Sequence, residues 1–189
     1  MKIIFLDIDG VLNTDETIDR IEDEYEKTGI KKIEIDEFRV GYLKRIVEMT
    51  DAKIVLSSSL RYRFKKVGDK CIANNKNYAP YFLEIFSKFG LEIYDVTPKL
   101  NIECRRQDEI KAWLFLNKEV DSFVILDDET TELMDFVGTN LIILNKLPIG
   151  QMVMDMRDST GLCEEHITQA IDILNKRNYS KVLIKNRIN

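Results

Sequence analysis

Short, continuous runs of apolar residues recur along the chain and predict buried β-strands. The runs are Ile3–Leu6, Ile54–Leu56, Phe123–Leu126 and Leu141–Leu144. Because every position in such a run is apolar, it suits a strand that is covered on both faces of a sheet. The stretch "GLEIYDVTP" adds a shorter candidate strand before Pro98.

Between these runs, apolar residues recur at helical spacing. Residues 82–89 carry phenylalanine and isoleucine at i, i+3, i+4 and i+7, and Gly90 follows as a typical helix end. Further helices are predicted around residues 43–47, with Asp36 as N-cap, around residues 110–114 and around residues 167–174. Strands that alternate with helices predict an α/β fold, a three-layer Rossmann-like domain with a mainly parallel sheet.

Two stretches lack this regular pattern. Residues 13–35 and residues 62–81 are mostly polar, and they follow the first and second predicted strands directly. Ligands of open α/β sheets bind beyond the carboxyl ends of the strands, so we expect these insertions to form a rim or a small cap. We predict one domain over residues 1–189, with a tail from residue 176 that is either an edge strand or partly disordered.

Composition narrows the classes of function. The chain has 189 residues, 44% of them hydrophobic and 32% charged, and a formal net charge of -5, which argues against a long basic groove for nucleic acid. No apolar run approaches the roughly 20 residues that span a bilayer, so we expect no membrane association. Three scattered cysteines suggest reduced thiols in a cytoplasmic protein. His166 is the only histidine, which disfavours Ser-His-Asp catalysis, and we expect it to be solvated.

Polar residues capable of phosphate chemistry follow three of the predicted strands. They are Asp7 and Asp9 after the first, Ser57, Ser58 and Arg61 after the second, and Asp127 and Asp128 after the third. Parallel strands deliver these groups to one edge of the sheet, where four carboxylates need a divalent cation, and an oxygen-only set favours Mg²⁺. A metal flanked by a hydroxyl and a cation is a receptor for a phosphoryl group.

Each of these motifs taken alone has a simpler explanation. Aspartate and serine are common in helix caps and turns, so Asp127–Asp128 and the serine triplet are compatible with a purely structural role. The stretch "DIDGV" is more specific, because it joins an apolar strand, two spaced acids and a glycine. The three motifs together, in this order, favour the chemical interpretation.

The motifs resemble those of the haloacid dehalogenase (HAD) superfamily. "FLDIDGVLN", "IVLSSS" and "VILDDE" are similar to its first, second and fourth motifs. "SSSLR", "DVTP", "RQDEIKAWL" and the pair Gly161–Leu162 resemble a small HAD subgroup found in Swiss Army Knife RNA repair proteins. Leu60 stands where that subgroup usually has tryptophan, a departure that weakens any inference of ring stacking on substrate.

The resemblance implies roles for the matching residues. Asp7 would be the nucleophile that forms an aspartyl-phosphate, and Asp9 would be the general acid and then the general base. Mg²⁺ would be held by the Asp7 side chain, the Asp9 backbone carbonyl and the pair Asp127–Asp128, with Asp128 as the favoured direct ligand. Phosphate-binding positions would be Ser57, Ser58, Gly10 and the cation of the third motif.

Three residues are candidates for the cation of the third motif. Arg106 fits the subgroup's pattern near a helix start, with Arg105 and Lys99 as competitors. The alternative interpretation of Arg106 is a surface arginine that pairs with Glu109 or Glu103. Arg61 opens "RYRFKK", a run that suits phosphate and base contacts or a solvated face, and it is a candidate substrate contact.

The predicted function is a Mg²⁺-dependent phosphomonoester hydrolase of the HAD type. Alternatives are a receiver-type phosphoacceptor domain, whose acidic residues occur in a different order, and a non-catalytic HAD-like binding module. Predicted partners are a phosphorylated small molecule or nucleotide, and a nucleotide or a phosphorylated nucleic-acid end, such as a 3′-phosphate, is the leading substrate hypothesis. The sequence makes no prediction about oligomeric state.

Overall fold

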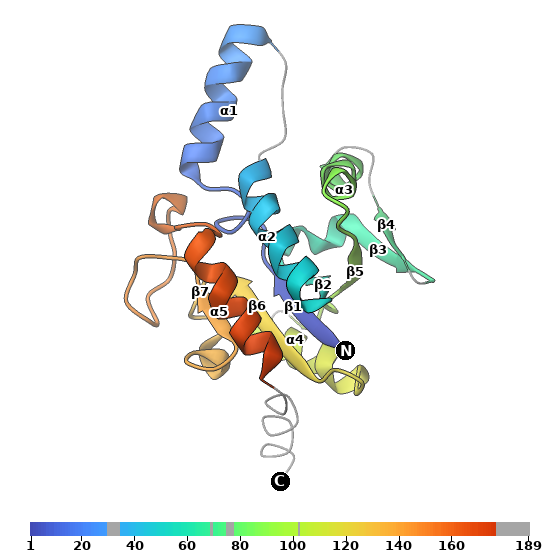
Figure 1. Ribbon diagram of the computed structural model, residues 1–189. Coiled ribbons are helices and arrows are strands. Elements are labelled where there is room, and N and C mark those ends of the chain that lie inside the picture. Colours follow the sequence, from blue (N-terminus) through green and yellow to red (C-terminus); the bar gives the residue numbers. More distant parts are fainter. Residues whose placement is uncertain (30–34, 69, 75–77, 102, 177–189) are drawn as a thin grey trace.

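A five-stranded parallel sheet forms the centre of the molecule in a computed structural model, which describes residues 1–29, 35–68, 70–74, 78–101 and 103–176 (Figure 1). The strand order is β5-β2-β1-β6-β7, and every neighbouring pair is parallel. The strands are β1 (Lys2–Leu6), β2 (Lys53–Leu56), β5 (Ile93–Val96), β6 (Ser122–Asp127) and β7 (Leu141–Ile143). All five predicted strands are therefore confirmed.

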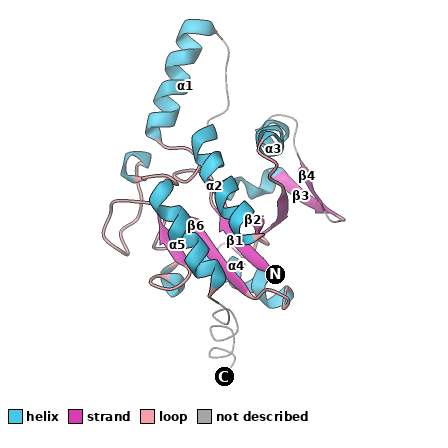
Figure 2. Ribbon diagram, in the orientation of Figure 1, coloured by secondary structure: helices cyan, strands magenta, loops and turns pink. Residues whose placement is uncertain are grey.

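Helices cover both faces of this sheet, as the colouring by secondary structure shows (Figure 2). The α-helices are α1 (Asp15–Thr28), α2 (Glu37–Thr50), α3 (Tyr78–Lys88), α4 (Arg106–Leu116) and α5 (Glu164–Asn175). Short 3₁₀ helices are η1 (Ser59–Arg63), η2 (Met134–Phe136) and η3 (Met156–Asp158). Helices α2 and α5 lie on one face and α4 on the other (Figure 1), so the predicted three-layer α/β fold is confirmed.

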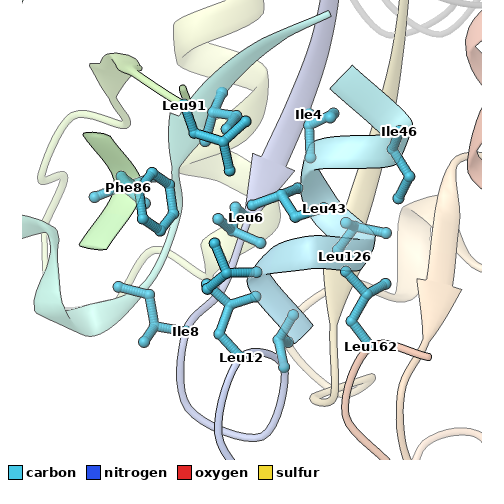
Figure 3. Packing of buried hydrophobic residues seen from close by; sticks show 14 of the residues in the cluster. Ile4, Leu6, Ile8, Leu12, Leu43, Ile46, Phe86, Leu91, Leu126 and Leu162 are labelled. Carbon is cyan, nitrogen blue, oxygen red and sulfur yellow. The ribbon is translucent and has the colours of Figure 1, made fainter. Parts of the chain in front are cut away.

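Alternation along β1 divides the core into two clusters. Ile4 and Leu6 belong to the cluster under α2, where Leu43 and Ile46 pack over them (Figure 3). Phe5 belongs to the other cluster, on the side of α4. Because side chains alternate between faces, Asp7 follows on the α4 side, which is the side from which an α4 residue meets it.

Two helix ends predicted from the sequence have the expected geometry. The carboxylate of Asp36 accepts a hydrogen bond from the backbone N–H of Phe38 at 2.9 Å, so Asp36 is the N-cap of α2. Gly90 follows α3 with a φ of 70°, and the N–H of Leu91 donates to the carbonyl of Phe86. A left-handed residue at this position is the usual way to end a helix.

The two polar insertions contain regular structure of their own. Residues 13–35 include α1, which stands away from the body of the molecule (Figure 1). Residues 62–81 include an antiparallel hairpin of β3 (Phe64–Val67) and β4 (Lys70–Ala73) and the start of α3. The single-domain organisation and the rim or cap role of these insertions stay predictions, and the predicted tail lies outside the described residues from 177 onward.

The predicted environment of His166 is wrong. The side chain is buried, and its Nδ1 accepts a hydrogen bond from the N–H of Cys163 at 3.2 Å in a capping box at the start of α5. Burial lowers the pKa of His166, although the charge of Glu165 raises it. The error arose because His166 occupies the first turn of the helix, where its capping contact draws it inward. Within the described residues, no helix combines the length and apolarity needed to cross a membrane.

Candidate active site

The ends of three adjacent strands place the sequence motifs beside one another. The N–H of Asp7 donates to the carbonyl of Leu126 at 3.0 Å, and the N–H of Ser57 donates to that of Leu6 at 2.9 Å. Asp127 is the last residue of β6. The sheet ladder thus continues into the motifs, and the prediction that they share one edge is confirmed.

Three carboxylates form a compact cluster at this edge. Asp7, Asp127 and Asp128 are all buried, and each offers an oxygen within 4.8 Å of the oxygens offered by the other two. The guanidinium of Arg106 contacts Asp127, and its Nη1 lies 3.2 Å from Oδ2 of Asp7. The carboxylate of Asp9 is not part of this cluster, so three of the four predicted carboxylates meet here.

The electrostatics of the cluster are unbalanced. Burial raises the pKa of Asp127, against the opposing charge of Arg106, and burial raises the pKa of Asp128 to about 6. Burial also disfavours the charged form of Arg106, but Asp127 and Asp7 outweigh it and raise the pKa of the guanidinium. One cation therefore faces three carboxyl groups, and the shifts show that full ionisation of the acids is costly.

This set of residues fits a hard divalent cation. All the donors are carboxylate oxygens, which Mg²⁺ prefers, and a dication would supply the charge that Arg106 alone does not. Gly10 leaves room beside the cluster, because a Cβ at this position would lie 1.9 Å from Oδ2 of Asp128. Its φ of 74° also favours glycine, as the sequence predicted for a sharp turn.

Asp9 is held apart from the cluster by Asn13. The Nδ2 of Asn13 donates to Oδ1 of Asp9 at 3.0 Å, while the N–H of Gly10 donates to Oδ1 of Asn13 at 3.0 Å. Burial raises the pKa of Asp9, the hydrogen bond from Asn13 lowers it, and the charge of Asp7 raises it further. The balance is a raised pKa, which suits a carboxyl group that gives up and takes back a proton.

Asp128 is positioned by two residues from later in the chain. The hydroxyl of Ser159 donates to Oδ2 of Asp128 at 2.5 Å, and the side chain of Asn145 donates to the Asp128 carbonyl. The second carboxylate of the pair thus has its orientation fixed by residues that come later in the chain. One oxygen of Asp127 is fixed in the same way, because Oδ1 accepts from the N–H of Glu129 at 2.9 Å.

The second motif brings one unpaired hydroxyl to the site. The Oγ of Ser57 is buried and has no hydrogen-bond partner among the described residues, which is costly unless a ligand supplies one. The Oγ of Ser58 accepts from the N–H of Leu60 at 3.2 Å and caps η1. Binding of phosphate by Ser57, Ser58 and Gly10 stays a prediction.

Arg61 lies beneath the second motif and is only 5% exposed. Its Nη2 lies 2.5 Å from Oε2 of Glu109, and its Nη1 donates to the carbonyl of Ser58 at 2.9 Å. These contacts brace the turn that carries the serines. A direct contact between Arg61 and substrate stays a prediction, and the observed contacts do not support it.

Among the three candidates for the third-motif cation, the structure brings Arg106 to the cluster. The N–H of Arg106 donates to Oε2 of Glu132 at 3.0 Å, which fixes the first residue of α4. Arg105 is an exposed N-cap, and the ammonium of Lys99 lies over the ring of Tyr62 at 5.1 Å. The alternative pairing of Arg106 with Glu109 is not observed.

Three functional positions were missed by sequence reasoning. Asn13, four residues after Asp9, carried a signal, since an amide at this spacing reaches back across a turn. Glu109 is expected from the sequence as a partner of Arg106, but the fold pairs it with Arg61, 48 residues away in the chain. Ser159 carried no local signal, because it lies 31 residues from the carboxylate that it contacts.

Comparison with known proteins agrees with this geometry. The sequence model of the family described as "HAD domain in Swiss Army Knife RNA repair proteins" matches residues 3–167, which include most of β1, every motif residue and most of the helices. No curated protein and no solved structure matches the chain. The chain therefore belongs to the HAD superfamily, in the family of HAD domains of Swiss Army Knife RNA repair proteins.

Proposed function

We propose that the protein is a Mg²⁺-dependent phosphomonoester hydrolase that works through an aspartyl-phosphate on Asp7. Membership of the HAD superfamily supports a HAD-type phosphatase in general. The observation that carries the finer proposal is the division of labour among the acids. Asp7, Asp127 and Asp128 cluster around one space, while Asp9 has a raised pKa and is held separately by Asn13.

In the first step, an oxygen of Asp7 attacks phosphorus and the bond from phosphorus to the leaving oxygen breaks. Asp9 donates its proton to that leaving oxygen, so the alcohol departs neutral. A raised pKa supports this role, because it increases the fraction of Asp9 that is protonated. Arg106, whose Nη1 lies 3.2 Å from Oδ2 of Asp7, keeps the nucleophile oriented.

In the second step, Asp9 is a carboxylate and accepts a proton from water while the water oxygen attacks phosphorus. The bond between phosphorus and the Asp7 oxygen breaks, which releases phosphate and restores both carboxyl groups to their starting states. A bound Mg²⁺ would neutralise carboxylate charge and polarise the phosphoryl oxygens. Asp7, Asp128 and the Asp9 carbonyl are its proposed ligands, with Asp127 shared between the metal and Arg106.

For the substrate, we propose a nucleotide or the phosphorylated end of a nucleic acid, with small phosphorylated metabolites as the alternative. The description of the family, which names RNA repair proteins, supports the first choice. The net charge of -5 predicts that any contact with a polymer is local and weakened by salt. Comparing a 3′-phosphorylated oligonucleotide with sugar phosphates, at low and moderate salt, distinguishes the two.

A cytoplasmic location belongs to the same proposal. The thiols of Cys71, Cys104 and Cys163 are free, as expected of a protein in a reducing compartment. Fractionation of cells that express the protein, with the redox state of the thiols measured by alkylation, tests this part.

The activity itself is tested with p-nitrophenyl phosphate. We expect hydrolysis that requires Mg²⁺, is lost in EDTA and returns when Mg²⁺ is restored. Asp7→Asn is expected to abolish turnover, and Asp172→Asn, the same chemical change at an exposed position of α5, is the matched control. Full activity in metal-free buffer, or an active Asp7→Asn variant, rules out the mechanism.

A further inference from the structure

Arg63, the last residue of η1, carries a guanidinium that no carboxylate of the described residues neutralises. The two other arginines at this edge are paired, Arg61 with Glu109 and Arg106 with Asp127. Arg63 is half-buried, and its guanidinium forms neither an ion pair nor a hydrogen bond within the described ranges. A half-buried cation without an ion-pair partner among the described residues is a candidate anion receptor.

The orientation of Arg63 leaves its donors available. The guanidinium carbon lies 4.8 Å from the centre of the Tyr78 ring, at the start of α3. A cation–π contact of this kind uses none of the N–H donors of the guanidinium in a hydrogen bond. The contact with Tyr78 therefore restrains the group while its donors stay available to an anion.

Arg63 also lies close to the catalytic residues. It ends a 3₁₀ helix that begins at Ser59, directly after the second motif, and five residues of such a helix extend only about 8 Å along the axis. The charge of Arg63 also acts on Asp9. Burial raises the pKa of Asp9, and the charge of Arg63 lowers it. Since Asp9 protonates the leaving oxygen in the proposed reaction, a negative charge carried by the leaving group would come within the field of Arg63.

We propose that Arg63 binds a second anionic group, a phosphate or phosphonate carried by the leaving group of the substrate. The inference rests on the proposed function, and it narrows the substrate class to phosphomonoesters whose alcohol bears another negative charge. Arg63 is then a specificity-determining residue, whereas Arg61, two residues earlier, braces the turn.

Two aryl phosphates that differ only in the second charge test this inference. One is 4-(phosphonomethyl)phenyl phosphate, and the other is its uncharged counterpart, 4-ethylphenyl phosphate; the corresponding meta isomers cover a second position of the anion. We expect wild type to prefer the charged member of at least one pair by roughly tenfold or more in kcat/KM, the scale of one charge-assisted hydrogen bond.

The preference is expected to fall to near one in Arg63→Ala and to return in part in Arg63→Lys, which keeps the charge without the fork. The matched control is Lys65→Ala, which removes the same charge from an exposed position of β3 and should keep the wild-type preference. Thermal unfolding of each variant verifies that it is folded.

Binding of the same compounds to Asp7→Asn, with and without Arg63→Ala, separates recognition from turnover. If wild type hydrolyses neither member of either pair, the proposed function fails, and the binding preference still decides the role of Arg63. The inference is overturned if wild type shows no preference for the charged members, or if Arg63→Ala retains that preference.

Discussion

Replacing Asp128 with asparagine is expected to stabilise the metal-free protein at neutral pH while removing its activity. Asp128 is buried, and burial raises the pKa of its carboxyl group from 3.8 to about 6. At neutral pH the Asp128 carboxyl group is ionised in the folded protein, although burial disfavours its charged form. Asparagine removes the charge and keeps an oxygen that accepts the hydrogen bond from Ser159.

The magnitude follows from the pKa. The difference between 3.8 and about 6 corresponds to roughly 3 kcal/mol for the ionised form. A raised folded-state pKa gives stability that is complete below the unfolded value and is lost as pH rises through the folded value. The penalty is therefore absent near pH 4 and complete above about pH 7. Since a charge-assisted bond to Ser159 is weakened, we expect a net gain of about 1–2 kcal/mol.

The assay is urea denaturation in EDTA at about pH 5 and about pH 7.5, on either side of the folded-state pKa of about 6. Asp128→Asn should raise the free energy of unfolding at the higher pH and have a smaller effect at the lower one. Added Mg²⁺ should stabilise wild type more than the variant, because the ion offsets the negative charge of the Asp128 carboxylate, which only wild type carries. Asp172→Asn should stay within about 0.5 kcal/mol of wild type at both values. Destabilisation by Asp128→Asn at neutral pH in EDTA, or an equal effect at both values, refutes the reasoning.

Three further variants test individual contacts. Gly10→Ala should lose about 2 kcal/mol or more of stability and most of its activity, because φ is positive at this position and the new Cβ would overlap the carboxylate of Asp128. Denaturation measures the loss of stability and turnover measures the loss of activity. Arg61→Ala should lower the free energy of unfolding by about 3–5 kcal/mol, because it leaves Glu109 buried without its ion-pair partner. Its activity should fall equally for all substrates, and a selective loss of activity toward oligonucleotides would contradict the bracing role. Asn13→Ala should raise the pKa of Asp9 further and move the basic limb of the kcat/KM profile to higher pH; an unmoved limb would separate Asn13 from the general acid.

The sequence predicted the sheet and the meeting of the motifs because both depend on local, repetitive signals. Fully apolar runs fit only strands covered on both sides, and parallel strands must end at a common edge. The N-cap at Asp36 and the helix end at Gly90 were predictable for the same reason, since the chemistry lies within a few residues. Asp7, Asp127 and Asp128 then met without any long-range information beyond strand order.

The contacts that the sequence did not predict depend on the direction in which a helix turns a side chain, or on residues that lie far apart in the chain. The sequence predicted Arg61, the first residue of "RYRFKK", as the substrate contact. A 3₁₀ helix has three residues per turn, so residues two positions apart point to different sides, and η1 turns Arg61 inward. Ser159 reaches Asp128 only through the path of the chain after β7, which no local pattern encodes.

Detection of a phosphoryl group on Asp7 tests the central claim most directly. In Asp9→Asn, a good leaving group such as p-nitrophenolate departs without protonation, while attack of water lacks its base, so turnover should fall by roughly 10²-fold or more and the intermediate should accumulate. Acid quenching followed by peptide mass spectrometry should then find phosphate on the peptide that contains Asp7, and none in Asp7→Asn/Asp9→Asn. Phosphate on another residue, or release of phosphate at an undiminished rate with no labelled peptide, would contradict the account.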